Sequence, residues 1–366
     1  MKRSPLHDYH QKHGAKFVEF AGWEMPISYG SVIAEHQATR TQAGFFDVSH
    51  MGRLKITGRH GRRLLERVLT RRVTDMAERT CRYSLICNEA GGILDDVIVY
   101  RFDNHWMLVV NASNRAKIMS HLQAQLGDFS ADVEDQTEST VMVALQGPTA
   151  MGHIGRFSSE VPTLAKYAFT VKNLLIMKLT VSRTGYTGED GVEVILPAGM
   201  ADKALKLLLK ESDGKPPMML CGLAARDTLR MEAGMPLYGH ELSEDIDPIS
   251  AGLKFAVDLD KDAEDRVGPF IGIEALKAIA AAGPKRRRVG LIMEGKRSPR
   301  QGMKVMSGAT EVGEVTSGCL SPTLGYPIAM AYVDADARKE SLHLKISDDT
   351  VNVNVVKLPF YKTAGA

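Results

Sequence analysis

The chain has 366 residues, 44% of them apolar and 25% charged, with a formal net charge of +2. A chain of this length needs about two or three domains, because single hydrophobic cores seldom extend beyond about 250–300 residues. The near-neutral charge argues against nucleic acid as a partner, and no apolar run reaches the roughly 18 residues of a transmembrane helix. The four cysteines form no C-x-x-C pair, which indicates reduced thiols and not a disulfide framework.

The N-terminal segment predicts a short helix over residues 5–13, with Ser4 as its N-cap and Gly14 as its stop. Histidines recur on this helix at every third position, at His7, His10 and His13. No cluster of cysteines or carboxylates completes a coordination shell, so we interpret the histidines as solvated surface side chains and expect no metal. No signal-peptide core is visible, which favours a cytoplasmic location.

Residues 82–111 predict a meander of strands at 83–87, 93–102 and 106–110, joined by turns at 88–92 and 103–104. A helix should follow, because Ile118, Leu122 and Leu126 recur at helical spacing.

Two adjacent carboxylates, Asp95 and Asp96, fall inside the second of these strands. Side chains alternate across a strand, so Asp96 shares a face with Ile98 and Tyr100. A buried ionised carboxylate is costly unless it is paired, hydrated or functional, and one face of this strand is therefore a candidate cavity wall. The alternative is a strand that begins only at Val97, with both carboxylates in the preceding glycine turn.

Residues 174–182 and 192–196 predict two strands around a glycine-rich turn at 183–191, and residues 201–210 predict an amphipathic helix. Strands and helices alternate without a long βαβ series, which favours an α+β fold over a doubly wound sheet.

The glycine-rich turn carries side chains suited to a flat ligand. Its glycines let the backbone approach closely, and Tyr186 offers a ring for stacking. Glu193, in the following strand, can accept two parallel N–H bonds from an aminopyrimidine-like edge. A plain hairpin turn with a surface glutamate is the alternative.

A mostly apolar helix is predicted over residues 222–233, ending at Gly234, and it contains Arg226. The guanidinium could bind a ligand carboxylate, or it could pair with Asp227 or another acid.

From residue 285 onward only short strands are predicted, at 288–293, 304–306, 311–315, 328–332, 342–346 and 351–358. An Ala/Gly/Pro-rich link at 281–285 precedes them. The four basic residues at 285–288 are interpreted as part of this solvated link and not as a phosphate or nucleic-acid contact. We therefore expect an all-β, barrel- or sandwich-like domain over residues 285–366.

Several common cofactor and hydrolase motifs are absent from the sequence. It contains no G-x-G dinucleotide fingerprint, Walker A pattern, H-E-x-x-H zinc motif or G-x-S-x-G elbow.

Together, nine blocks in order along nearly the whole chain resemble the T-protein of the glycine cleavage system. They are P-L-H-D (5–8), F-A-G-W-E-M-P (20–26), F-D-V-S-H-M (46–51), G-G-I-L-D-D (91–96), A-L-Q-G-P (144–148), T-G-Y-T-G-E (184–189), G-L-A-A-R-D (222–227), E-A-G (232–234) and T-S-G (316–318).

This resemblance implies an α+β fold of three domains arranged as a cloverleaf around a central folate channel. Residues 1–284 would hold two intertwined, sequence-discontinuous domains that form most of the folate site, and residues 285–366 the β-barrel-like third domain. The implied activity is aminomethyl transfer from the lipoyl arm of the H-protein to tetrahydrofolate, a co-substrate. A bacterial cytoplasm, or a mitochondrial matrix after leader removal, is the implied location.

The resemblance also assigns residues. Asp96 matches the catalytic position, Glu193 would read the pterin edge with Tyr186 beside it, and Arg226 matches an arginine near the folate and its acidic tail. Further channel positions are Tyr83, Ile98, Tyr100, Asn111, Met51 and, from the third domain, Arg300. Phe255 departs from the family, where many members carry tryptophan, and Tyr167 lies in a segment that does not align clearly.

Two other functions are compatible with such a fold. One is a folate-dependent demethylase that acts on a small methylated donor. The other is a non-enzymatic folate-binding or iron–sulfur-assembly factor, whose K-G-C-Y-x-G-Q-E pattern is absent near residues 221–225.

Overall fold

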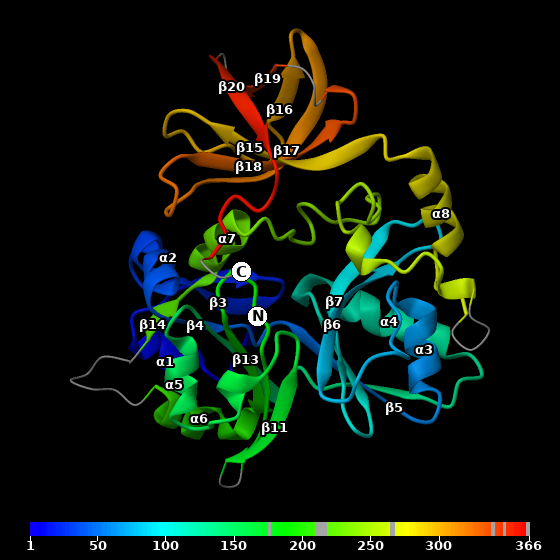
Figure 1. Ribbon diagram of the computed structural model, residues 1–366. Coiled ribbons are helices and arrows are strands. Elements are labelled where there is room, and N and C mark those ends of the chain that lie inside the picture. The colour runs from blue at the N-terminus through cyan, green and yellow to red at the C-terminus, as the bar shows by residue number, and fades with distance from the viewer. Residues whose placement is uncertain (175–176, 210–217, 264–267, 338–340, 347–348, 364–366) are drawn as a thin grey trace. The chain divides into compact units, whose positions relative to one another are not determined.

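Helices and strands alternate along the chain in the computed structural model, which confirms the predicted α+β class (Figure 1). The structure describes residues 1–366 except 175–176, 210–217, 264–267, 338–340, 347–348 and 364–366. The chain forms two compact units of three segments each. The first consists of Met1–Arg62, Asp75–Arg82 and Val97–Asp227, and the second of Arg63–Thr74, Tyr83–Asp96 and Thr228–Ala366.

The first unit begins with a small three-stranded sheet and two short helices. The sheet has the order β1-β3-β2, and its third strand is antiparallel to the second. The Ser31 hydroxyl accepts from the Ala34 N–H (3.3 Å) and caps the second helix. These elements are β1 (Lys2–Arg3), α1 (His7–Lys12), β2 (Lys16–Phe20), β3 (Trp23–Ser28) and α2 (Val32–Thr41).

A six-stranded sheet forms the centre of the first unit, in the order β11-β12-β13-β10-β4-β14. Neighbouring strands are antiparallel except for the parallel pair β4–β14. Their bounds are β4 (Gly44–Asp47), β10 (Thr140–Gln146), β11 (Phe169–Leu174), β12 (Met177–Ser182), β13 (Gly191–Pro197) and β14 (Met219–Cys221). The helices beside it are α5 (Ala150–Gly155) and α6 (Ala201–Leu208), and the 3-10 turns are η2 (Val161–Thr163) and η3 (Ala198–Met200).

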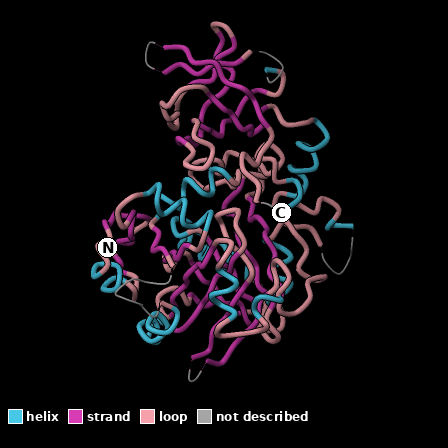
Figure 2. Tube along the Cα trace, turned by 60° about the vertical axis from the view of Figure 1, so that its left-hand side comes forward, coloured by secondary structure: helices cyan, strands magenta, loops and turns pink. Residues whose placement is uncertain are grey.

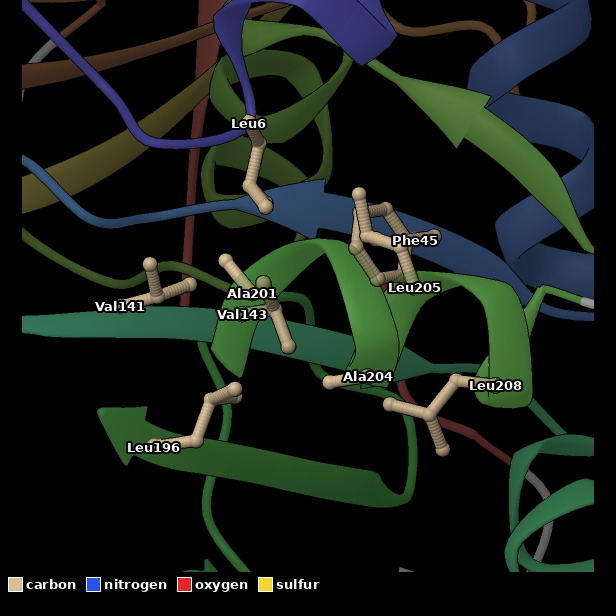
Figure 3. Close-up of a pocket in the computed structure, with 9 residues that line it drawn as sticks. All are labelled: Leu6, Phe45, Val141, Val143, Leu196, Ala201, Ala204, Leu205 and Leu208. Atoms are coloured by element: carbon tan, nitrogen blue, oxygen red, sulfur yellow. The ribbon is translucent and has the colours of Figure 1, made fainter. Parts of the chain in front are cut away.

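The two faces of this sheet have different chemistry. One face is apolar and packs against α5 and α6, as Figure 3 shows for Ala201, Ala204 and Leu205 above strands β10 and β13. Because side chains alternate along a strand, the residues between these apolar positions point to the opposite face. That second face carries Ser182 and Glu193, which are direct partners in the β12–β13 register.

A second sheet has the order β6-β7-β8-β5-β9, and α4 follows β8 in the chain as the apolar spacing predicts. Strand β7 begins at Ile93, so Asp95 and Asp96 lie within the strand and not in the preceding turn. The elements are β5 (Gly52–Thr57), α3 (Gly61–Val68), β6 (Thr80–Cys87), β7 (Ile93–Arg101), β8 (Trp106–Val110), η1 (Ala112–Asn114), α4 (Arg115–Leu126) and β9 (Asp132–Asp135).

The C-terminal strands close into a six-stranded barrel in the order β15-β18-β17-β16-β19-β20, which confirms the predicted all-β domain (Figure 2). Alternate residues such as Val289, Leu291 and Met293 fill its core. The strands are β15 (Arg286–Met293), β16 (Lys304–Ser307), β17 (Thr310–Leu320), β18 (Pro327–Asp334), β19 (Leu342–Ile346) and β20 (Asp349–Val356). Before the barrel come α7 (Leu223–Glu232), α8 (Ile273–Ala282), η4 (Lys254–Ala256) and η5 (Lys261–Ala263).

Three local predictions were wrong. His7 and His10 are buried, because each hydrogen-bonds a distant carboxylate: His7 pairs with Glu24 at 3.0 Å and His10 with Asp47 at 2.8 Å. The strand predicted over 174–182 is divided, because Leu174 ends β11 and β12 covers Met177–Ser182; residues 175–176 lie outside the described residues. The basic run 285–288 is mostly the start of β15, where Arg288 donates to the carbonyls of Gly234 (3.0 Å) and Ala251 (2.9 Å). Residue 210, the predicted end of one helix, lies outside the described residues.

No helix in the described part of the chain is long and apolar enough to cross a membrane.

A buried ion pair joins the end of α7 to the second unit's barrel. Arg230 donates to Glu241 (2.7 Å) and to the Ser317 hydroxyl (2.9 Å), and Glu241 also accepts from the Thr316 hydroxyl (2.6 Å). Burial opposes the charge on Glu241, but Arg230 and these hydroxyls leave its carboxyl pKa below the usual value. Such a pair is costly to break, because the remaining partner is left as an uncompensated buried charge.

We expect Arg230→Met to destabilise the protein by about 3–5 kcal/mol, because Glu241 loses its counter-ion in an apolar setting. The control is Lys206→Ala, which removes an exposed pair with Asp202 in α6 and should cost under about 0.5 kcal/mol. Urea unfolding followed by circular dichroism measures both. Equal midpoints for the two variants would contradict this assignment.

Candidate active site

Glu193 lies on the polar face of the six-stranded sheet, in the middle of β13. It is only 8% exposed, so it is not the surface glutamate of a plain hairpin. The neighbouring position on β10 is Ala144, whose small side chain leaves the carboxylate uncrowded on that side. The alternation that buries Val192 and Val194 against the helices places Glu193 on the opposite face.

A chain of hydroxyl groups ends on this carboxylate. The Thr184 hydroxyl donates to Glu193 Oε2 at 2.6 Å, and the Ser182 hydroxyl lies 2.9 Å from Thr184 Oγ1. Tyr100 Oη lies 3.0 Å from Ser182 Oγ. All four side chains are buried. Burial raises the pKa of Tyr100 well above its usual value, and the Glu193 charge acts in the same direction, so the phenol keeps its proton.

Arg226 and Tyr186 form a second part of the same unit's polar region. The guanidinium carbon lies 4.7 Å from the centre of the Tyr186 ring, which is a cation–π contact. Within the described residues Arg226 has no ion-pair partner, and its Nη1 is buried without a hydrogen-bond partner. Burial lowers the pKa of Arg226, and the Glu193 charge opposes this shift. The structure therefore does not show the pairing with Asp227 that was the alternative for this arginine.

The glycine-rich segment that carries Tyr186 is clamped at several points. Arg183 makes a bidentate pair with Asp190 (3.0 and 2.6 Å) across the base of the turn. The buried Arg40 donates to the Thr187 carbonyl (2.7 Å) and to Glu189 (2.8 Å). A Cβ on Gly185 would lie only 1.8 Å from the Gln146 side chain, so glycine is required there. These contacts hold the Tyr186 ring on a rigid turn.

His50 lies close enough to this region to be influenced by its charges. The side chain is 3% exposed, its Nδ1 has no hydrogen-bond partner among the described residues, and its ring packs edge-on against Phe20. Burial lowers the pKa of His50 to about 3; the charges of Arg226 and Arg53 act in the same direction, and Asp47 acts against them. His50 is therefore a neutral imidazole at physiological pH.

In the second unit, Asp96 is held by an aromatic side chain. The Tyr83 hydroxyl donates to Asp96 Oδ2 at 3.1 Å, and the ring of Phe255 stacks on Tyr83 with centroids 6.0 Å apart. Asp96 is half-buried, whereas its neighbour Asp95 is fully buried. Phe255 is 66% exposed, an unusual environment for a large aromatic residue.

The other predicted site residues have different environments. Ile98 is half-buried and Tyr100 fully buried on the strand face that also carries Asp96. Met51 and Asn111 are half-buried, and Asn111 directly precedes η1. Arg300 is exposed, and its backbone N–H contacts Met303 Sδ at 3.3 Å. The structure thus groups Tyr83 with Asp96, and Tyr186, Arg226, Tyr100 and Glu193 with one another.

Tyr167, which could not be aligned, is exposed and has a left-handed backbone conformation with φ of 63°. Its carbonyl accepts from the Cys81 N–H at 2.6 Å.

The cavities within the first unit lie elsewhere. The apolar one in Figure 3, of about 10 Å³ and lined by residues such as Leu6 and Phe45, holds one water at most. A shallow groove of about 430 Å³ runs between α1 and α6. Its lining includes none of the predicted site residues. Among the described residues, no group of three or more His, Cys, Asp or Glu could hold a metal ion.

Sequence reasoning missed Ser182, Thr184 and His50. The first two had a detectable signal, because Ser182 and Glu193 occupy one face of a predicted hairpin and Thr184 opens its glycine-rich turn. His50 had no detectable signal in the sequence, because its burial depends on residues that are distant along the chain.

Comparison with known proteins assigns the chain to a family. The GCVT N-terminal domain matches residues 6–261, and the glycine cleavage T-protein C-terminal barrel domain matches residues 286–362. The chain belongs to the glycine cleavage T-protein family. The second match covers the strands that close the six-stranded barrel.

Individual relatives are similar to this chain over nearly its full length. An aminomethyltransferase of Rubrobacter xylanophilus is 41% identical over 363 residues, covering 99% of this chain and 95% of the relative. One from Streptomyces coelicolor is 41% identical over 370 residues, covering 99% and 98%. The crystal structure of glycine cleavage system aminomethyltransferase T from Bartonella henselae is 33% identical, with a TM-score of 0.89 and coverage of 99% and 98%. This T-protein is therefore an enzyme of aminomethyl transfer, and the demethylase alternative is not favoured.

The neutral state of His50 predicts a pH dependence of stability. As pH falls below about 6.5, the unfolded chain binds a proton that the folded His50 does not, so stability decreases with a slope of up to about 1.4 kcal/mol per pH unit. We expect His50→Gln to flatten the decline of the thermal midpoint between about pH 7 and pH 5. A variant whose decline is as steep as the wild type's would show that His50 is not buried in its neutral form.

Proposed function

We propose that this T-protein transfers the one-carbon unit of an aminomethyl group from the lipoyl arm of the H-protein to tetrahydrofolate. The products are 5,10-methylenetetrahydrofolate, ammonia and the dihydrolipoyl arm. The proposal extends the aminomethyl transfer of the family to a specific donor and acceptor. A cytoplasmic location and a requirement for no metal belong to the same proposal.

The observation that carries the proposal is the environment of Asp96. Its carboxylate is half-buried, lies on a strand and accepts one hydrogen bond from Tyr83 (3.1 Å). A carboxylate that is fixed and partly shielded from water acts more strongly on a nearby cation than one in bulk solvent. Such a group is suited to a reaction that develops positive charge on its substrate.

The proposed reaction develops such a charge. The C–S bond of the lipoyl thioether breaks, and the carbon that leaves with its amino group is an iminium-like cation. The carbon then bonds to N5 and N10 of tetrahydrofolate, and its nitrogen departs as ammonia. The two protons lost by N5 and N10 equal those gained by the thiolate and by the amino group. Asp96 would stabilise the cation and orient the attacking nitrogen.

The residues around Glu193 fit the chemistry of a folate. A pterin ring presents N–H donors along one edge, and Glu193 is a fixed carboxylate acceptor. A folate also carries carboxylates, and Arg226 has a buried donor, Nη1, without a partner among the described residues. We propose that Glu193 binds the pterin edge, that Tyr186 flanks the ring and that Arg226 binds an acidic group.

We expect Asp96→Asn to lower turnover by about a hundred- to a thousand-fold, because the amide keeps the shape of the side chain but not its charge. The assay is methylenetetrahydrofolate formation from tetrahydrofolate and aminomethyl-loaded H-protein. Asp128→Asn, an exposed substitution in the first unit, is the matched control and should retain wild-type turnover. Near-normal turnover of Asp96→Asn with unchanged folate binding would reject Asp96 as the catalytic group.

We expect Glu193→Ala to raise the dissociation constant for tetrahydrofolate by about ten- to a hundred-fold, since hydrogen bonds to a charged acceptor are the stronger kind. Isothermal titration calorimetry with tetrahydrofolate measures this directly. An unchanged dissociation constant would contradict the assignment of Glu193 to the pterin edge.

A further inference from the structure

The hydroxyl chain on the polar face of the central sheet has a direction. A carboxylate can only accept, so the Thr184 hydroxyl must donate its proton to Glu193 Oε2 (2.6 Å). Thr184 Oγ1 is then free to accept from Ser182 (2.9 Å), and Ser182 Oγ can accept from the Tyr100 phenol (3.0 Å). In this arrangement each O–H points toward the carboxylate, and such chains strengthen their members by mutual polarisation.

A second contact competes for the Ser182 proton. Ser182 Oγ lies 3.2 Å from the Glu193 carbonyl oxygen, which is farther than Thr184 Oγ1. In either arrangement Thr184 is the group that touches the carboxylate, and Ser182 supports it from behind. Thr184 is therefore the first position to test and Ser182 the second.

We infer that Thr184 and Ser182 are positioning residues that fix the Glu193 carboxylate for a flat heterocycle with adjacent N–H donors. This inference rests on the proposed function, which assigns Glu193 to the pterin edge. Each carboxylate oxygen can accept two hydrogen bonds, so Thr184 uses one acceptor position of Oε2 and leaves the rest of the group for a ligand. Fixing the side chain in advance removes the cost of ordering it when the ligand binds.

A positioning residue affects ligand binding, whereas a purely structural residue affects only the stability of the fold. Glu193 accepts a hydrogen bond from a hydroxyl in the glycine-rich turn, and burial of a charge held in that way does not favour stability by itself. Removing the Thr184 hydroxyl leaves the buried Glu193 carboxylate with one partner fewer and therefore also lowers stability. The positioning role is measured by the tetrahydrofolate dissociation constant of the folded variant, and the loss of stability is measured separately by thermal unfolding.

The experiment compares Thr184→Val with Thr180→Val in the intact enzyme, using tetrahydrofolate as the probe. Thr180 lies on β12, on the same face as Ser182, and its hydroxyl makes no hydrogen bond in the described structure. We expect Thr184→Val to weaken tetrahydrofolate binding about ten-fold, with kcat at saturating tetrahydrofolate within about two-fold of wild type. Thr180→Val should bind like the wild type, and Thr184→Ser should restore binding because it keeps the hydroxyl.

Two further variants test the positioning role of Thr184 and the proposed role of Glu193 separately. Glu193→Gln should weaken binding alone, and the double variant Thr184→Val/Glu193→Gln should be no weaker than Glu193→Gln, because the two residues act as one unit. If Glu193→Gln weakens binding but Thr184→Val does not, the positioning role is wrong and the proposed function stands. If Glu193→Gln has no effect, the proposed role of Glu193 is wrong and the positioning role falls with it.

If Thr184→Val does not fold, Ser182→Ala provides a second test of the positioning role. It removes the donor behind Thr184 and should weaken tetrahydrofolate binding by about two- to five-fold, as expected for one neutral hydrogen bond. Wild-type binding by a folded Ser182→Ala, with Thr184→Val unfolded, would overturn the inference. Weakened binding that Thr180→Val does not reproduce would support it.

Discussion

The 2.6 Å hydrogen bond from Thr184 to Glu193 is the contact on which the polar face of the central sheet depends. It holds the Glu193 carboxylate in place on that face, where the side chain is only 8% exposed. Burial, with the Glu193 charge acting in the same direction, raises the pKa of the Cys81 thiol and of the Tyr100 phenol. Both groups therefore stay protonated and can donate hydrogen bonds.

The same charge accounts for the state of Arg226. Burial disfavours the guanidinium charge, and Glu193 is the nearby carboxylate whose charge favours it. The contact with the Tyr186 ring lowers the cost further without using any N–H group. Nη1 of Arg226 has no hydrogen-bond partner among the described residues, whereas the buried Arg53 and Arg40 of the same unit donate to backbone carbonyls.

Much of this arrangement could be predicted from alternation along strands. The pattern of residues 106–110 predicted β8 with the observed bounds, and the six barrel strands lie close to their predicted ranges. The strand placement of Asp96 and Glu193 also followed from local pattern. What could not be predicted depends on long-range pairing: His10 meets Asp47, and Arg226 meets Tyr186 across 40 residues of chain. The residues next to His10 in the sequence give no information about Asp47, which lies on a distant strand.

Each of the two compact units is assembled from three separate segments, and this has a consequence for how the protein is made. A ribosome that has synthesised Asp96 has not yet supplied the last segment of the first unit, which continues to Asp227. The second unit begins at Arg63 and is complete only when the last barrel strand, β20, has been made. Native contacts of such high sequence separation slow folding, and during that delay apolar strands stay exposed. A product truncated before Asp227 therefore completes neither unit, whereas a product truncated after it still contains all three segments of the first.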